Sequence, residues 1–233
     1  MTMTEQSALI VGAGQGLSAS VARKCAERGM NVALAARDTA KLSDLVSEIG
    51  ASSFACDASD PVSVADLFAQ LDAATGTPNL VLYNPSYRQR APFIELDVEE
   101  VRKTLMISCY GGFLVGLEAV KRMTVVGEGA IFFTGASASV KGYKQSAPFA
   151  MGKFGLRGLA QSMARELAPQ NIHVAHFVID GGIEKDDDPR AEMRGSDGLL
   201  HPDAIADTYM HIYDQHRTAW TWEVELRPWV EKF

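Results

Sequence analysis

The chain has 233 residues, 47% of them hydrophobic, and a formal net charge of -7. This length suits one large domain with a buried core, and the acidic balance without a basic run argues against a nucleic-acid partner. No apolar segment approaches the ~20 residues that a membrane-spanning helix needs, and residues 1–6 lack the pattern of a signal peptide. Cys25, Cys56 and Cys109 lie in apolar patterns, so we expect reduced thiols in a cytoplasmic protein.

Short apolar runs alternate with helical patterns along the chain. The runs predict strands at residues 8–11, 31–36, 53–56, 79–83, 130–134 and 173–179, with a short edge strand at 222–226. Helical spacing of apolar residues predicts helices at 18–28, 39–49, 61–71, about 98–123, 147–167 and 202–215. This alternation predicts an α/β fold of Rossmann type, doubly wound, with a mainly parallel sheet of about seven strands and helices on both faces.

One stretch, residues 181–200, is irregular and rich in glycine, aspartate and charge. It follows the sixth predicted strand at the carboxyl edge of the sheet, where open α/β sheets bind ligands. We interpret it as a lid over a substrate pocket, with a solvated surface loop as the alternative. We find no linker or internal repeat, so residues 1–233 are expected to form a single domain.

The first strand ends in a glycine-rich turn that leads into the first helix. Free backbone N–H groups and the positive end of a helix favour an anion at such a turn. The sequence therefore predicts a phosphate site at Gly12, Gly14, Gln15, Gly16 and Leu17. A plain strand–helix turn is the alternative, because the spacing G-x-G-x-x-G is not met: Leu17 stands where its last glycine would be.

In their order along the chain, these motifs resemble those of the short-chain dehydrogenase/reductase family, and the resemblance covers nearly the whole chain. The family's Thr-Gly-x-x-x-Gly-x-Gly is matched by Val11-Gly12-x-x-x-Gly16-x-Ser18, and its Asn-Asn-Ala-Gly is represented by Tyr83-Asn84-Pro85-Ser86. Its adenine-binding aspartate falls on Asp57, its catalytic lysine on Lys153, and its Pro-Gly after the sixth strand on Asp180-Gly181.

The resemblance implies an oxidoreductase that transfers a hydride between a nicotinamide cofactor and the carbonyl or alcohol of a small molecule. The implied cofactor-binding residues outside the glycine turn are Arg37, Asp57, Ala58, Asn84, Pro85, Ser86, Lys153, Gly181 and Ile183. The family also implies a homo-dimer or homo-tetramer, through residues 114–123 and 154–167. The scattered histidines show no metal-ligand spacing, so we expect no metal.

The charge after the second strand favours NADP(H) over NAD(H). An acidic residue there would bind both ribose hydroxyls and repel a 2′-phosphate. Instead the strand ends in Ala35-Ala36 and the next side chain is Arg37, whose guanidinium pairs with a phosphate through two parallel hydrogen bonds. Asp38 is the counter-argument, and we interpret it as the cap of the helix that begins at residue 39 or 40.

Most of the catalytic residues that the family implies are replaced. In the family a tyrosine four residues before the lysine passes a proton to the substrate oxygen, a serine holds that oxygen, and an asparagine supports a water relay. These three places fall on Phe149, Ala136 and Ser108, and a phenylalanine has no ionisable proton. Of the four residues, Lys153 alone remains.

Three interpretations stay open. The chain is an oxidoreductase whose proton comes from another group, and we favour this reading with Lys153, Ser137 and Tyr143 as catalytic residues and Ser139 as a substitute for Ser137. Alternatively, it is a catalytically silent NADP(H)-binding module that acts as a sensor or scaffold. In the third reading the site has changed to proton abstraction or dehydration, using Lys153 or Asp180.

Three polar residues follow Asn84 at the ligand edge of the predicted sheet. Tyr87, Arg88 and Arg90 are candidates for contact with a polar or anionic substrate. They are equally well explained as solvated residues of a surface loop.

Overall fold

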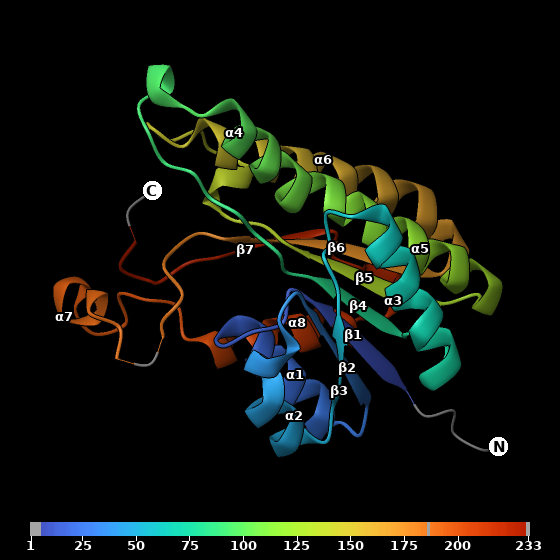
Figure 1. Cartoon of the computed structure of the whole chain (residues 1–233). Helices are drawn as coiled ribbons and strands as arrows, with labels where there is room; N and C mark the ends of the chain where they lie inside the picture. The colour runs from blue at the N-terminus through green and yellow to red at the C-terminus, as the bar shows by residue number, and fades with distance from the viewer. Residues whose placement is uncertain (1–5, 186, 232–233) are drawn as a thin grey trace.

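The computed structural model describes residues 6–185 and 187–231, which form a seven-stranded sheet with helices on both faces (Figure 1). All neighbouring strands are parallel, in the order β3-β2-β1-β4-β5-β6-β7. The strands are β1 (Ser7–Val11), β2 (Asn31–Ala36), β3 (Ser52–Ala55), β4 (Leu80–Tyr83), β5 (Gly129–Thr134), β6 (Ile172–Ile179) and β7 (Glu223–Leu226). The doubly wound α/β fold predicted from the sequence is confirmed.

Two helical layers cover the two faces of the sheet (Figure 1). One layer holds α1 (Leu17–Glu27), α2 (Ser43–Ile49) and α8 (Pro202–Tyr213). The other holds α3 (Pro61–Ala74), α4 (Val98–Leu105), α5 (Gly111–Val126) and α6 (Ala147–Leu167). The short helix α7 (Arg190–Arg194) lies apart from both layers, within the irregular stretch after β6.

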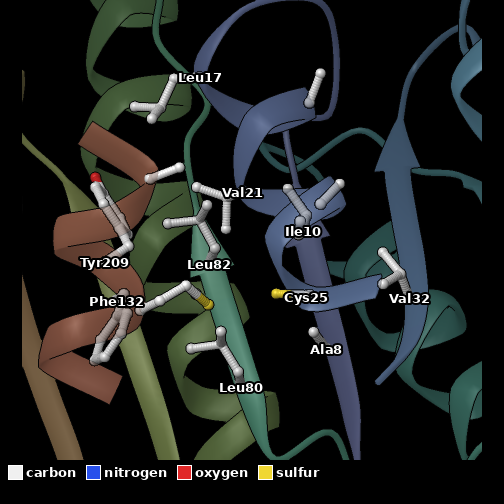
Figure 2. Packing of buried hydrophobic residues seen from close by; sticks show 14 of the residues in the cluster. Ala8, Ile10, Leu17, Val21, Cys25, Val32, Leu80, Leu82, Phe132 and Tyr209 are labelled. Carbon is white, nitrogen blue, oxygen red and sulfur yellow. The ribbon is translucent and has the colours of Figure 1, made fainter. Parts of the chain in front are cut away.

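Burial on both faces explains why the strands are apolar without alternation. In β1, Ala8 and Ile10 belong to one hydrophobic core and Leu9 and Val11 to the other. Figure 2 shows the first core, where Val21 and Cys25 of α1 lie beside Ile10 and Ala8, and Tyr209 of α8 lies near Phe132. Tyr209 also stacks on Phe177, with ring centroids 3.6 Å apart, and its hydroxyl shares a 3.0 Å hydrogen bond with the hydroxyl of Thr134.

Two predicted helices are less regular than their apolar spacing indicates. The helix predicted at 39–49 begins as a 3-10 turn (Thr39–Leu42), and Asp38 caps it by accepting the N–H of Ala40 at 3.2 Å. This confirms the interpretation of Asp38 as a cap. The helix predicted at 98–123 runs to Val126 and contains a π-helical turn (Met106–Tyr110) between α4 and α5. Such turns insert a residue into the helical ladder and are frequent at functional sites.

The helix Val98–Val126 is, within the described part of the chain, the one that is long and apolar enough to cross a membrane, with a mean hydropathy of 1.2 over its most apolar window. The expectation that no segment approaches this length was therefore wrong. The helix packs against α3 and α6, and 44% of that window is buried. A core helix of a folded domain meets the same criterion, so length and composition do not assign this helix to a membrane.

The end of the chain completes the sheet. The edge strand predicted at 222–226 is β7, which pairs with β6, and the helix predicted at 202–215 ends at Tyr213. Residues 181–200, of which residue 186 lies outside the described part, leave the sheet after β6 and return to it. An isolated β-bridge between Ile183 and Leu200 joins the two ends of this stretch.

Candidate functional site

The turn between β1 and α1 presents bare backbone at the carboxyl edge of the sheet. Gly12 and Gly16 have φ angles of 77° and 79°, a left-handed conformation that side chains disfavour. Gly16 is the N-cap of α1 and provides no side-chain hydrogen bond to the first helical N–H groups. Ser18 stabilises the turn, because its hydroxyl accepts the N–H of Gly14 at 3.0 Å and donates to the carbonyl of Gly14 at 3.1 Å.

Gly12 also allows two strands to meet closely. A Cβ placed on it would lie 2.7 Å from the backbone nitrogen of Pro85, in the loop that follows β4. The neighbouring N–H of Asn84 donates to the carbonyl of Val11 at 3.0 Å. The end of β1 and the start of the β4–α4 loop therefore form one continuous wall, and a side chain at residue 12 would push that wall apart.

A cleft of about 780 Å³ runs along the carboxyl ends of β1, β2 and β4. It lies at the point where the strand order reverses, which is the usual ligand site of open α/β sheets. Nine of the residues predicted to bind the cofactor line it: Gly12, Gly14, Gln15, Arg37, Asp57, Ala58, Asn84, Pro85 and Ser86. The cleft is also lined by Tyr87, a predicted candidate for substrate contact, and by residues that the sequence did not predict at a site, among them Ala13, Lys41, Cys56, Ser59 and Ile107.

Asp57 is a fixed carboxylate in this cleft. Its Oδ1 accepts hydrogen bonds from the hydroxyl of Ser59 at 2.6 Å and from the N–H of the same residue at 2.9 Å. The Ser59 hydroxyl, its N–H and the charge of Arg37 hold the pKa of Asp57 below its usual range, against the opposing effect of burial. Asp57 therefore stays ionised, and its second oxygen Oδ2 faces no partner that competes with a ligand among the described residues.

The three charged residues that follow β2 are Arg37, Asp38 and Lys41, and they differ in their partners. Arg37 is exposed at the rim of the cleft. Asp38 is held by its cap to Ala40 and by the ammonium of Lys41, 3.4 Å from its Oδ2. The carboxylate of Asp38 is thus already paired, whereas Arg37 lines the cleft and is exposed.

Five of the residues predicted to bind the cofactor lie outside the cleft. The side chain of Leu17 is buried in the core, so its backbone alone faces the turn. Gly16 lines a neighbouring hollow of about 770 Å³, which Glu184 and Lys185 of the irregular stretch also line. Gly181 packs against Pro228, where a Cβ would lie 2.8 Å from the proline Cδ, and Ile183 forms the bridge at the base of that stretch. The fifth is Lys153, whose side chain is buried beneath the end of β5 and does not line the cleft.

Lys153 is buried beneath the end of β5. Its side chain is 2% exposed, and its Nζ donates a 2.7 Å hydrogen bond to the carbonyl of Thr134. Burial lowers the pKa of this ammonium from 10.5 to about 8. The Nζ also lies 5.9 Å from the ring centroid of Phe149, one helical turn earlier in α6. The lysine therefore loses its proton more readily than a free lysine, and it lies next to the ring of Phe149.

The hydroxyls predicted as substitutes lie on the loop that follows β5. Ser139 is fully buried, and its hydroxyl accepts the N–H of Ala136 at 3.1 Å. Ser137 is half-buried at the start of a 3-10 turn (Ser137–Ser139), and Tyr143 is 45% exposed. Ser137 is therefore better placed than Ser139 to offer a hydroxyl to a ligand, because the Ser139 hydroxyl is already bonded inside the loop.

Two other residues of interest are held by specific partners. Ser108, in the π-helical turn, accepts the N–H of Tyr87 and donates to the carbonyl of the same residue, both at 3.3 Å. Asp180 is buried, and its carboxylate pairs with the ammonium of Lys141 at 3.2 Å. Among the residues that the structure describes, no three His, Cys, Asp or Glu side chains are grouped so as to hold a metal ion.

The family of the chain follows from comparison with known proteins. A family model described as short chain dehydrogenase matches residues 6–185. The chain therefore belongs to the short-chain dehydrogenase family, whose members related to it are oxidoreductases.

Two curated relatives illustrate the range of this family. Trans-4-hydroxycyclohexanecarboxylate dehydrogenase of Sinomonas cyclohexanicum is 31% identical over 183 residues, which cover 74% of this chain and 70% of that protein. D-threitol dehydrogenase of Mycolicibacterium smegmatis is 27% identical over 172 residues, which cover 72% of this chain and 66% of that protein.

Solved structures agree with this family. A short-chain dehydrogenase from Rhodopseudomonas palustris is 36% identical, with a TM-score of 0.83, and the match covers 96% of this chain and 99% of that one. A metagenomic short-chain oxidoreductase in complex with NADP is 26% identical, with a TM-score of 0.83 and coverage of 96% and 97%. The match spans almost the whole length of both solved chains.

We predict that Gly12→Ala destabilises the protein by about 1–3 kcal/mol, because the new Cβ meets Pro85 and the backbone is left-handed. Gly14→Ala is the matched control, since its φ is not positive and a Cβ there meets no atom within 4 Å. Denaturant unfolding of the two variants measures the difference. Equal stabilities would contradict the close approach.

We also predict a pH-dependent effect of Lys153→Met on stability. The folded-state pKa of Lys153 is about 8 against 10.5 for a free lysine, so between these values the unfolded chain binds more protons and native stability rises with pH. Between pH 8 and pH 10.5 the free energy of unfolding of the native protein should therefore rise by up to about 3 kcal/mol relative to that of the variant. The adjacent His176 stays neutral throughout this range, because burial lowers its pKa to about 4.

Urea unfolding at a series of pH values measures this difference. The control is Lys144→Met, which removes an exposed lysine from the preceding loop and should leave the pH dependence of the native protein unchanged. The same pH dependence for the two variants would show that Lys153 carries no burial penalty.

Proposed function

We propose that the chain is an NADP(H)-dependent oxidoreductase that interconverts a carbonyl compound and an alcohol at a site without the family's tyrosine. The observation that carries this proposal is the cleft, which gathers a bare glycine turn, a fixed carboxylate and an exposed arginine at the switch point of the sheet. Membership of the short-chain dehydrogenase family supports the reaction class.

The residues of the cleft fit a dinucleotide. Gly12 lies so close to Pro85 that a Cβ there would collide with the proline, and the uncapped start of α1 offers N–H groups to a pyrophosphate. Asp57 would bind the adenine end, and Asn84 would bind beside the nicotinamide end. When bound, the nicotinamide supplies a hydride to the carbonyl carbon of the substrate or accepts one from the alcohol.

Arg37 supports the choice of NADP(H). Its guanidinium is exposed at the rim of the cleft, free to pair with a 2′-phosphate, while the carboxylate of Asp38 is engaged by Ala40 and Lys41. The negative charge that would repel the phosphate is thereby offset. The related metagenomic oxidoreductase was solved with NADP, which supports the same preference here.

Lys153 is the proposed source of the proton. Phe149 has no proton to give, whereas burial brings the pKa of Lys153 to about 8, close to the pH at which a general acid works best. During reduction the Nζ of Lys153 loses one proton, the substrate oxygen gains it, and solvent restores it. Ser137 would hold the oxygen, and Tyr143 is the alternative donor on the same loop.

A silent NADP(H)-binding module is the second candidate. It is favoured by the contact of Lys153 with Thr134, since this hydrogen bond turns the ammonium toward the protein interior. In that case the cleft would bind the nucleotide and the missing tyrosine would leave no rapid proton transfer.

Other properties of the chain are proposed on the same basis. Residues 1–233 form a single domain, residues 181–200 cover the bound substrate, and the protein works in the cytoplasm without a nucleic-acid or membrane partner. A homo-dimer or homo-tetramer would pair the outer faces of α5 and α6. These faces expose large apolar side chains: Phe113 and Leu117 of α5, and Met151 and Phe154 of α6.

We predict that Arg37→Gln weakens NADPH binding by about 10- to 100-fold, which is the loss expected for charge-assisted hydrogen bonds to one phosphate. NADH lacks this phosphate and should bind both proteins equally within about threefold. Fluorescence titration of the two nucleotides gives the four dissociation constants. An equal loss of affinity for NADPH and NADH would show that Arg37 does not bind the 2′-phosphate.

We predict that the native protein oxidises NADPH with at least one member of a panel of ketones and aldehydes. Lys153→Met should lower this rate by ~10²–10⁴-fold, because it removes the proposed acid. Phe149→Tyr, which adds a hydroxyl at the family's position, should retain or raise the rate. Tight NADPH binding with oxidation by neither the native protein nor Phe149→Tyr would favour the silent module instead.

A further inference from the structure

The loop between β4 and α4 places an arginine next to the cleft. Tyr87 lines the cleft, and Arg88 follows it on the exposed side. The loop is held on both sides of this residue. Ser108 binds the N–H and carbonyl of Tyr87 at 3.3 Å, and the N–H of Ala91 donates to the carbonyl of Gln145 at 3.3 Å. Arg88 is therefore presented by a fixed backbone rather than by a loose loop.

The guanidinium of Arg88 lies against the ring of Phe149. Its Cζ is 5.2 Å from the ring centroid, within the range of a cation–π contact. A cation–π contact uses none of the guanidinium N–H groups as hydrogen-bond donors to an oxygen, so these groups stay available to a ligand. The same ring has the Nζ of Lys153 at 5.9 Å, which places two cations around the residue at the family's tyrosine position.

The carboxylates of Asp180 and Glu100 are held by residues other than Arg88. The carboxylate of Asp180 pairs with Lys141 at 3.2 Å, and that of Glu100 is bound by the hydroxyl of Tyr87 and by Lys103 at 3.5 Å. Within residues 6–185 and 187–231, Arg88 itself has no hydrogen-bond or ion-pair partner. The guanidinium is thus oriented by an aromatic ring, but its N–H groups have no acceptor among the described residues.

We propose that Arg88, held on Phe149, binds a carboxylate of the substrate, so that the site acts on a carbonyl compound or alcohol that carries an acid group. This inference rests on the proposed oxidoreductase function. A carboxylate presents two coplanar oxygens that match the two parallel N–H groups of a guanidinium. Phe149 then has a role of its own: its apolar ring orients the arginine where a tyrosine would supply a proton.

Binding of matched probes tests the proposal without turnover. Cyclohexanecarboxylate and cyclohexanecarboxamide have nearly the same shape, and the first alone is charged. We expect the acid to bind the NADP-saturated native protein at least tenfold more tightly than the amide in calorimetric titrations. Arg88→Gln should remove this preference, because a neutral amide cannot form the charge-assisted pair. Arg88→Lys should retain part of it, since the charge is kept but the planar fork is lost.

Arg102→Gln is the matched control. It removes an exposed arginine of α4 that pairs with Glu99 at 2.7 Å, and it should bind the acid as the native protein does. Phe149→Leu keeps an apolar side chain but removes the ring under Arg88, so the acid should bind several-fold more weakly. The proposal would be overturned if the native protein bound the two probes equally, or if Arg88→Gln bound the acid as tightly as the native protein.

The same titrations separate this inference from the proposed function. NADP affinity is measured for each variant, and Arg88→Gln should leave it unchanged. If the native protein does not bind NADP, the proposed function fails, and the acid and amide are then compared on the protein alone. If NADP binds and the acid has no advantage, the carboxylate site fails while the proposed function stands.

Discussion

The candidate site depends on the close approach of Gly12 to Pro85. This approach brings the end of β1 against the loop after β4, at the place where the strand order of the sheet reverses. The glycine turn, the carboxylate of Asp57 and the β4–α4 loop are thereby gathered around one cleft. A side chain at residue 12 would separate these walls, so the geometry of the cleft follows from the absence of a Cβ at one position.

The chemistry of the site depends on how Phe149 and Lys153 share the start of α6. The lysine is buried against the carbonyl of Thr134, and the ring of the phenylalanine contacts both its ammonium and the guanidinium of Arg88. Phe149 thus presents an apolar ring to a guanidinium, and burial lowers the pKa of the neighbouring lysine to about 8.

The fold was largely predictable because burial on both faces leaves continuous apolar runs in the strands and periodic ones in the helices. The cap at Asp38 was predictable from local chemistry, and so was the gathering of Asp57 and Asn84 at the carboxyl edge of the sheet. The sequence did not predict the direction of Lys153 or the contact between Arg88 and Phe149. Both depend on side-chain packing between segments more than fifteen residues apart, which periodicity does not encode.

We propose that the cleft at the switch point of the sheet binds NADP(H). Titration of the isotope-labelled protein with NADP, followed through its backbone amide resonances, tests this claim without a substrate. The account predicts the largest shifts at residues 12–17, Arg37, residues 57–59 and residues 84–87, around the walls of the cleft. Saturable shifts confined to another surface, or no shifts at millimolar NADP, would contradict it.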